Sequence, residues 1–523
     1  MSVIIRPHPP RPTAAPMPAP ARRGLALAVL CVSLLIVTLD NTILNIALPA
    51  LVRARHATDA QLQWIVDAYA VVFGGLLLIA GTVADRLGRR RVFLAGLLLF
   101  AAGSAAAAFS GTVTELIWAR AAMGLGAACI MPSTLSIIAD LFREPRERAQ
   151  AIGLWSATSG LGIALGPIVG GWLLERYWWG SVFFVNVPIA LAGAAAAVWL
   201  VPESRDPARR PLDAVGAPAA TAGLLLLLWA IIESPTRGWH SGMVLAVGAA
   251  GLAVLVAFAL WERHTQHPML VVEAFRDRRF SIAMGSVAMA VFALMGALFV
   301  LTQYLQFSLG YSAFAAGVRI LPVAGLLAVT APLSTLLDRW LGTKIVIATA
   351  LAVISGGLLW LSRLTVSADF GHTLPGLLLL GAGAGLAIAP ATASVIGSLP
   401  PQRAGVGSAT NGTALQTGGA LGVAVLGATL AARYQGQMTT VLAGHAVPPA
   451  AAHAITGSLG AALGVAGQVG GPTGSLLAAA GRSAFLDGMR LAMTVAAIVV
   501  AVGAVLVLVA LPSRATDPES HGR

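Results

Sequence analysis

The 523-residue chain has few charged residues and only two cysteines. Charged residues make up 10% of it, against about 25% in ordinary soluble domains. Cys31 and Cys129 both stand in apolar segments, and they give neither a disulfide framework nor a CxxC metal site. No Ser/His/Asp set is recognisable, and His264 and His267 stand in a polar segment without further candidate ligands. The sequence therefore predicts a membrane protein with no metal, no cofactor and no enzymatic activity.

Long apolar segments are what the chain has in abundance. Hydrophobic residues make up 57% of it, and the mean hydropathy is +0.83. Fourteen segments are long enough to cross a bilayer as helices of about 20 residues. An all-α integral membrane protein is expected, with helices at roughly 24–50, 62–83, 92–110, 114–138, 149–173, 181–201, 213–233, 242–261, 280–305, 314–337, 344–363, 373–394, 404–431 and 487–511.

The net charge of +12 comes from short basic clusters between the apolar segments. Because there is no basic helix or basic tail, nucleic-acid binding is not expected. Most of these arginines fall in the N-terminus and the even-numbered connections, and an even number of spans places both termini on one side. The positive-inside rule then predicts cytoplasmic termini in the bilayer of a cell membrane, and we expect a bacterial cell.

A weak internal repeat suggests how the helices are grouped. ADRLGRRR (84–91) follows the second expected helix, and LDRWLGTK (337–344) follows the tenth. This pairs helices 1–6 with helices 9–14 and leaves two inserted helices, a common transporter plan. The expected division is a disordered cytoplasmic N-terminus (1–23), a six-helix bundle (24–201), a linker with the two inserted helices (202–262), a second bundle (263–511) and a cytoplasmic tail (512–523). The second bundle includes a long extracytoplasmic loop (432–486) that could contain short amphipathic helices.

Three ionisable residues lie deep within expected membrane helices. At about 1.5 Å of rise per residue, Asp40, Asp67 and Arg120 all sit roughly 8–15 Å below the expected outer surface. An intramembrane charge costs at least about 2.5–3.5 kcal/mol and usually has a partner. We therefore expect these three side chains to face one polar cavity, with snorkelling of Arg120 to the interface as the alternative.

The connection between the second and third helices reads GTVADRLGRRRVF (81–93). Its glycines permit a tight turn, and its aspartate can accept hydrogen bonds from the arginines or from a nearby helix N-terminus. One interpretation is a conformational latch, and the other is plain positive-inside charge. The residues of this expected cytoplasmic gate are Gly81, Asp85, Arg86, Gly88, Arg89 and Arg90.

The fifth expected helix carries glycines at intervals of four residues, and a proline within this series bends the helix. This pattern suits close helix packing, and it also suits a moving part at a domain interface. The residues of this motif are Gly153, Gly162, Gly166, Pro167, Gly170 and Gly171.

Taken together, these motifs resemble the 14-helix drug:proton antiporters of the EmrB/QacA type in the major facilitator superfamily. LDNTILNIALP (39–49) resembles the helix 1 signature LDxTIVNVALP, and 81–93 resembles the loop motif GxLaDRxGRRxxl. The glycine pattern of 153–171 resembles the antiporter motif of helix 5, which argues for export. Further segments that resemble the family are WGSVFFVNVP (179–188), QFSLGYSAFAAGVRILP (306–322) and AGVGSATNGTALQTGGALGVA (404–424), so the resemblance spans roughly residues 24–431.

Among the departures from the family pattern, two lie in the motifs of helices 4 and 13. Met123 replaces the glutamine of the helix 4 motif RxxQG, so a polar neighbour of Arg120 is missing. Leu415 stands where the family often has an arginine in helix 13.

The resemblance implies a fold of two six-helix bundles around a central cavity, plus two extra helices. It also implies a monomer that exports small hydrophobic or cationic toxic compounds, driven by the proton gradient without a cofactor. Asp40 would be the main proton carrier, Asp67 a second carboxylate and Arg120 their partner. An uptake symporter of the same fold and a non-transporting receptor remain alternatives. Further polar residues expected at the cavity are Asn41, Asn45, Glu233, Gln303, Asn411 and Gln416, although Glu233 is shallow enough to be an interface carboxylate.

Overall fold

The computed structural model describes residues 20–205, 213, 215–265, 272–366, 368–398 and 404–511. Within these residues the secondary structure is helical, and 14 helices are long and apolar enough to cross a membrane. The predicted number of spans is therefore confirmed. The expectations for residues 1–19 and 512–523 lie outside the described residues, while residues 20–23, expected to be disordered, form the first turn of a helix.

The N-terminal half supplies six spans. They are α1 (Pro20–Arg55), α2 (Asp59–Leu87), α3 (Arg89–Ala108), α4 (Val113–Leu141), α5 (Pro145–Arg176) and the short α6 (Ser181–Phe184) with α7 (Asn186–Leu200). Helix α1 packs against α5 and α7, and α4 packs against α2 and α3. These contacts hold the six spans of the first half together as one bundle.

The C-terminal half repeats the arrangement. Its elements are the short η1 (Val272–Arg276), α10 (Arg278–Gln303) with its π-helical end η2 (Tyr304–Ser308), α11 (Ala313–Leu341), α12 (Thr343–Leu361), α13 (Phe370–Gly397), α14 (Ala404–Leu442) and α17 (Gly471–Ala510). Helix α13 packs against α11 and α12, while α10 packs against α14. The repeat noted in the sequence has a geometric counterpart, because Gly88 and Gly342 both adopt positive φ between helices (119° and 81°). Glycine adopts this conformation without a steric penalty.

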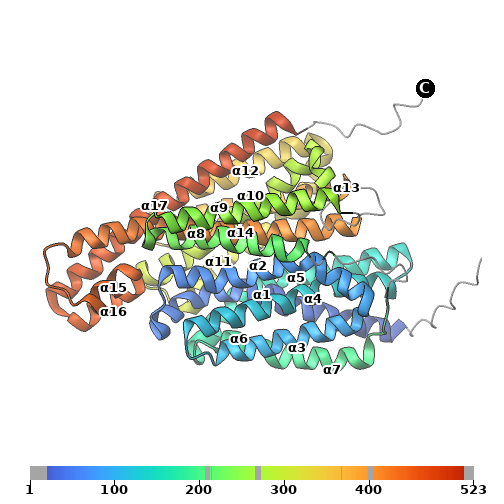
Figure 1. The fold of residues 1–523 in the computed structure, drawn as a ribbon, viewed down its shortest axis with the longest axis horizontal. Coiled ribbons are helices and arrows are strands. Elements are labelled where there is room, and N and C mark those ends of the chain that lie inside the picture. Colours follow the sequence, from blue (N-terminus) through green and yellow to red (C-terminus); the bar gives the residue numbers. More distant parts are fainter. Residues whose placement is uncertain are drawn as a thin grey trace, which may run out of the picture.

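The two inserted helices are α8 (Gly216–Arg237) and α9 (Gly242–His264). Helix α8 packs against both α2 and α14, and α9 packs mainly against α8 (Figure 1). The insertion therefore covers the line along which α2 of one half meets α14 of the other.

We call the end of the bundle where α1 begins and α17 stops the termini end, and the opposite end the distal end. The distal end differs in part from expectation, because short helices are present within 432–486 as expected but most of the segment is helical. Helix α14 continues to Leu442, α17 starts at Gly471, and α15 (Pro449–Gly457) and α16 (Leu459–Val469) lie between them (Figure 1). The Tyr434 hydroxyl donates to the carbonyl oxygen of Ile455 (2.9 Å) and ties α15 to α14. The predicted long loop is thus a packed helical cap with short connections.

The halves touch along two seams. One joins α2 to α14, and the other joins α5 to α11. On the second seam a Cβ at Gly171 would collide with the backbone of Phe314, and one at Gly317 would collide with the carbonyl of Pro167. Glycine lets the two backbones approach this closely.

Candidate functional site

Asp40 and Arg120 form an ion pair inside the N-terminal half. The Nη1 atom of Arg120 lies 2.5 Å from Oδ2 of Asp40, and the side chains are 1% and 0% exposed. The arginine also donates from Nε to the carbonyl oxygen of Ile65 (3.0 Å), and its guanidinium lies 4.3 Å from the Tyr69 ring centroid. Arg120 is therefore buried with partners, and the snorkelling alternative is wrong.

A third residue completes this cluster, and the sequence interpretation missed it. Asn186, the first residue of α7, is fully buried and donates from Nδ2 to Oδ1 of Asp40 (3.1 Å). The segment WGSVFFVNVP was noted only for its resemblance, although its buried asparagine was the available signal. The sulfur of Met123 lies 3.9 Å from Nη1 of Arg120, where the family pattern has a glutamine.

Asp67 does not join this cluster, so the expectation of one shared cavity is wrong. On α2, Ile65 and Tyr69 face α4, as their contacts with Arg120 show. Gln63 and Gly74 instead face α14, where they pack against Gly427 and Gln416. Because residues three or four apart share a helix face, Asp67 belongs with Gln63 on the face turned away from α4. The sequence predicted how far Asp67 lies along its helix, but it did not predict which neighbouring helix the side chain faces.

The glycines of α5 serve two interfaces. A Cβ at Gly162 would meet the Thr38 side chain and the Leu35 carbonyl oxygen, and one at Gly166 would meet Thr42 and Leu39 in the same way. Gly170 lies against Ile43, also on α1, whereas Gly171 and Pro167 face α11. Gly153 has open space around it. Gly162, Gly166 and Gly170 thus allow close contact between α5 and α1. Pro167 and Gly171 lie at the seam between the halves.

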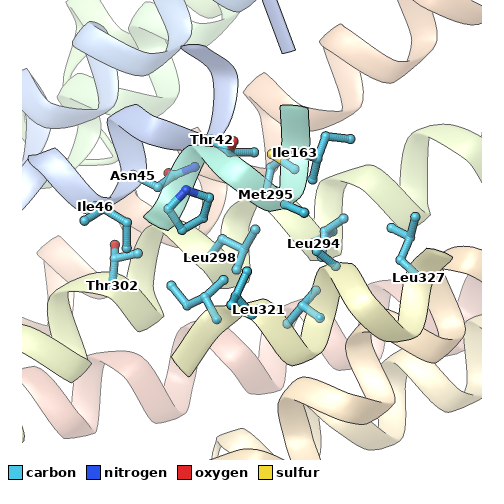
Figure 2. Close-up of a pocket in the computed structure, with 15 residues that line it drawn as sticks. Thr42, Asn45, Ile46, Ile163, Leu294, Met295, Leu298, Thr302, Leu321 and Leu327 are labelled. Atoms are coloured by element: carbon cyan, nitrogen blue, oxygen red, sulfur yellow. The ribbon is translucent and has the colours of Figure 1, made fainter. Parts of the chain in front are cut away.

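A cavity opens on the seam between α1 and α5 on one side and α10 and α11 on the other (Figure 2). Its wall is mostly aliphatic, with Thr42, Asn45 and Thr302 as polar members. In this conformation the cavity holds about 30 Å³, whereas sites for drug-sized ligands measure about 300–1,000 Å³. A ligand of that size fits only if the halves move apart. The remaining lining residues are Ile46, Ile163, Ala164, Pro167, Leu294, Met295, Leu298, Ile320, Leu321, Val323, Ala324 and Leu327.

Only one of the polar residues expected at the cavity lines this pocket. That residue is Asn45, whose Oδ1 atom is buried without a hydrogen-bond partner among the described residues. Asn41 and Gln303 bond to backbone carbonyls of their own helices, and Asn411 accepts from Thr392 on α13 (3.4 Å).

The other two expected cavity residues also lie elsewhere. Gln416 packs on Gly74 in the α2–α14 seam. Glu233 pairs with Arg237 one turn away (3.2 Å), at the distal end of α8. Glu233 therefore does not line the cavity, and its interpretation as an interface carboxylate stays a prediction.

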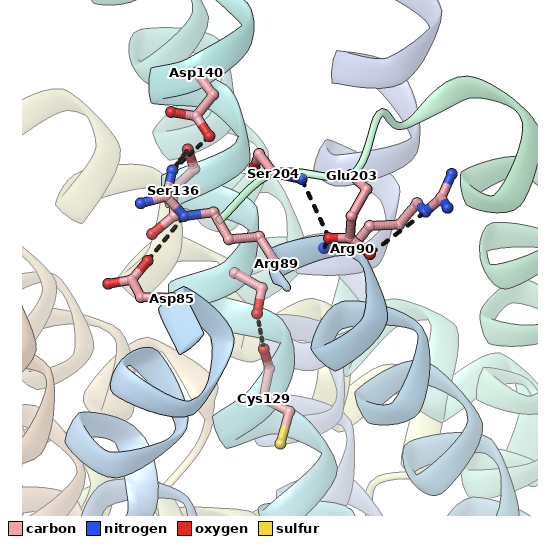
Figure 3. Close-up of polar contacts among 9 residues, drawn as sticks. Asp85, Arg89, Arg90, Cys129, Ser136, Asp140, Glu203 and Ser204 are labelled. Atoms are coloured by element: carbon pink, nitrogen blue, oxygen red, sulfur yellow. Dashed lines mark hydrogen bonds and ion pairs between the residues drawn. The ribbon is translucent and has the colours of Figure 1, made fainter. Parts of the chain in front are cut away.

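A polar network surrounds the turn between α2 and α3 at the termini end (Figure 3). Arg89 donates from Nε to Asp85 (2.8 Å) and from Nη1 to Asp140 on α4 (2.5 Å). Its backbone N–H donates to the carbonyl oxygen of Ser204 (2.9 Å). The predicted contact between Asp85 and the arginines is confirmed, and Asp140 adds a second carboxylate. Arg86 lies in the last turn of α2, and Gly81 lies near Pro132 of α4.

Glu203 is a further member that sequence reasoning missed. Its Oε1 accepts from the backbone N–H of Arg90 (3.2 Å), and its Oε2 lies 3.5 Å from Nε of Arg91. A Cβ at Gly88 would collide with this carboxylate. Glu203 therefore binds the N-terminus of α3 and fixes the segment that follows α7. Its signal was an acidic residue directly after a span.

The described residues contain no group of three or more His, Cys, Asp and Glu side chains placed to hold a metal ion.

Comparison with known proteins identifies the fold. Residues 30–423 match the Major Facilitator Superfamily. The chain belongs to the major facilitator superfamily. The 14 helices of membrane-spanning length in the described residues make this superfamily member a multi-pass membrane protein.

Among curated relatives, the multidrug efflux pump LfrA of Mycolicibacterium smegmatis is 35% identical over 94% of this chain and 97% of its own length. The tetracenomycin C resistance and export protein of Streptomyces glaucescens is 32% identical, over 96% and 94% of the two chains. The puromycin resistance protein pur8 of Streptomyces alboniger is 37% identical, over 85% and 89%.

Solved structures agree on the fold of this superfamily member. A bacterial homologue of the human lysosomal transporter Spinster, in an inward-facing and unoccupied conformation, aligns over 94% of this chain and 98% of its own. The TM-score is 0.63 at 18% identity. The peptide transporter POT in complex with sulfate aligns over 92% and 94%, with a TM-score of 0.59 at 17% identity. Both confirm the predicted fold class.

Proposed function

We propose that this protein is a proton-coupled drug efflux antiporter, which acts as a monomer and uses the proton gradient without a cofactor. Its substrates are small hydrophobic compounds, some of them cationic. Relatives named for drug export and antibiotic resistance cover almost the whole chain. The positive-inside distribution of arginines supports cytoplasmic termini, which makes the termini end cytoplasmic and the distal end extracytoplasmic.

The observation that carries this proposal is the position of α1. One side of α1 holds Asp40 in the buried pair with Arg120, and another side supplies Thr42 and Asn45 to the apolar cavity between the halves. The same helix is held against α5 by Gly166. A change in the ion pair therefore reaches the cavity wall through one rigid element.

In this mechanism an ionised Asp40 holds α1 against α4 and α7 through Arg120 and Asn186. Protonation of Asp40 neutralises the carboxylate, so the charge-assisted bonds weaken and α1 is released. Movement of α1 and α5 relative to α10 and α11 then widens the cavity toward one side of the membrane, as alternating access requires. Asp67 supplies a second protonatable carboxylate on the α2–α14 seam. At the termini end, the Arg89 network holds the α2–α3 turn and gates the cytoplasmic side.

Everted membrane vesicles test this function. Vesicles from an efflux-deficient host that expresses the protein should accumulate ethidium when a proton gradient, acid inside, is imposed. A protonophore should abolish the accumulation. Vesicles without gradient-driven accumulation, combined with uptake by whole cells, would favour a symporter. A susceptibility panel with ethidium, puromycin and methyl viologen would define the substrate range.

Two variants test whether Asp40 couples proton movement to transport. Asp40→Asn should reach the membrane and lose gradient-driven accumulation, because it has no carboxylate to protonate. Glu233→Gln removes a carboxylate from an exposed pair and should transport like the wild type. Normal accumulation by Asp40→Asn would refute the role of Asp40.

A further inference from the structure

Three polar residues lie in a row on the face of α2 that contacts α14. They are Asp59, Gln63 and Asp67, spaced four residues apart, so their side chains stack on one helix face over about 12 Å. Their exposed fractions are 3%, 0% and 0%. Asp59 is in the first turn of α2 at the distal end, and Asp67 lies two turns deeper.

Each of these side chains contains polar atoms without a protein partner. Both carboxylate oxygens of Asp67, both amide atoms of Gln63 and Oδ1 of Asp59 are buried with no hydrogen bond to a described residue. Leaving such an atom unsatisfied costs about 1–3 kcal/mol, and more for a charged group. Five unpartnered atoms along one helix face are difficult to reconcile with a purely structural role.

The described residues of α14 and α8 that pack beside this row are mostly apolar. Gln63 lies on Gly427, where a Cβ would come within 2.6 Å of its Cδ atom. One turn from Asp67, Ala70 and Val71 pack against Ala420 and Ala424 of α14 and against apolar residues of α8. The titratable group that faces Asp59 from α14 is Tyr434, and its hydroxyl is already bonded to Ile455. Water is therefore the partner that this row can recruit.

Helix capping does not explain Asp59. Thr58 and Gln61 already form a complete capping box at the start of α2, which satisfies the first backbone N–H groups. Nor does packing require Gln63, because a leucine would fill a similar volume without polar atoms. The row is better explained by movement of a proton than by stability of the helix.

We propose that Asp59, Gln63 and Asp67 form the proton-access route from the distal surface to Asp67. This inference rests on the proposed function. Asp59 accepts a proton from distal water, a water molecule held by Gln63 carries it inward, and the carboxylate of Asp67 receives it. Each transfer moves one proton and leaves the preceding carboxylate ionised again, so no other reactant is consumed. Gly427 has no side chain and lies directly against Gln63, so a side chain at that position would displace the amide.

The test compares two transport modes in proteoliposomes that contain the full-length protein. One mode is ethidium accumulation driven by a proton gradient, and the other is ethidium counterflow at equal pH, which needs alternating access but no net proton movement. Gln63→Leu should lower the initial rate of the driven mode at least fivefold and change counterflow less than twofold. Gln63→Asn, which keeps the amide and leaves room for water, should retain at least half of the driven rate.

Matched glycine variants test the space beside Gln63. Gly427→Ala places a methyl group against Gln63 and should lower only the driven mode. Gly436→Ala, on the same helix with nothing nearby, should change neither mode. Equal loss of both modes in Gln63→Leu would reveal a structural role and overturn the route, as would an unchanged driven rate. A wild type without driven accumulation would refute the proposed function itself, and the route with it.

Discussion

Replacing Asp40 with asparagine leaves the guanidinium of Arg120 in a buried site without its counter-charge. Removing one partner of a buried ion pair costs about 3–5 kcal/mol, and two charges 4 Å apart at an effective dielectric of 20 attract by about 4 kcal/mol. Arg120 keeps its bond to the Ile65 carbonyl and its contact with the Tyr69 ring. We therefore expect the lower limit, a loss of about 3 kcal/mol in the free energy of unfolding.

The assay is thermal unfolding of the purified protein in detergent. For a folding unit of 150–250 residues, 1 kcal/mol shifts Tm by about 2–4 °C, so Asp40→Asn should lower Tm by about 6–12 °C. Glu233→Gln is the matched control, because Arg237 is 47% exposed. An exposed pair contributes about 0–1 kcal/mol, so the control should lose at most about 4 °C.

A double variant separates loss of charge balance from loss of shape. Asp40→Asn combined with Arg120→Met removes both charges, and it should recover more than half of the stability that Asp40→Asn loses. Equal, small Tm shifts in Asp40→Asn and Glu233→Gln would refute the reasoning. They would mean that water reaches the pair and screens it.

Three other predictions follow from contacts described above. Gly166→Ala should lower Tm and transport, because its methyl group meets the backbone of α1 at an overpacking cost of about 1–3 kcal/mol, whereas Gly153→Ala, in open space, should not. Leu298→Trp should fill the cavity and lower ethidium resistance at least fourfold without lowering the amount of protein in the membrane. Burial raises the pKa of Asp213, but the N–H groups of residues 216 and 215 and the Trp261 indole outweigh this effect and hold it below its usual value. The ionised Asp213 carboxylate thus stabilises the folded protein above the ordinary carboxylate pKa of about 3.9, and this stabilisation is lost as the pH falls through the lowered pKa of Asp213. The Tm difference between wild type and Asp213→Asn should therefore shrink between about pH 5 and pH 3.

The contacts of α2 show where sequence reasoning stopped. Depth could be counted from the end of the helix, and Asp67 does lie level with the expected polar layer. Its direction could not be derived, because a membrane helix is apolar toward lipid and also apolar toward its neighbours. The usual polar–apolar periodicity therefore did not distinguish the α4 side from the α14 side. Asn186 was missed for a related reason, since its partner stands 146 residues away in the chain.

The distal end shows a second limit. Residues 432–486 are rich in glycine and alanine and contain prolines, which favours a loop. The structure makes most of this segment helical, since α14 and α17 extend past the membrane length and α15 and α16 pack between them. Buried contacts such as that of Tyr434 with Ile455 offset the weak helix propensity. Tertiary packing therefore overrode a local signal.

The amino-acid sequence alone determined that this is a 14-helix membrane protein with a polar layer in its N-terminal half and a charged turn after the second span. Those properties follow from segment length, hydropathy and local motifs, which act within about 20 neighbouring residues. Only the tertiary structure decided that Asp40 pairs with Arg120 and Asn186 while Asp67 lies on the seam with Gln63. The rotation of each helix about its own axis is set by the partners it packs against, and those partners are distant in the chain.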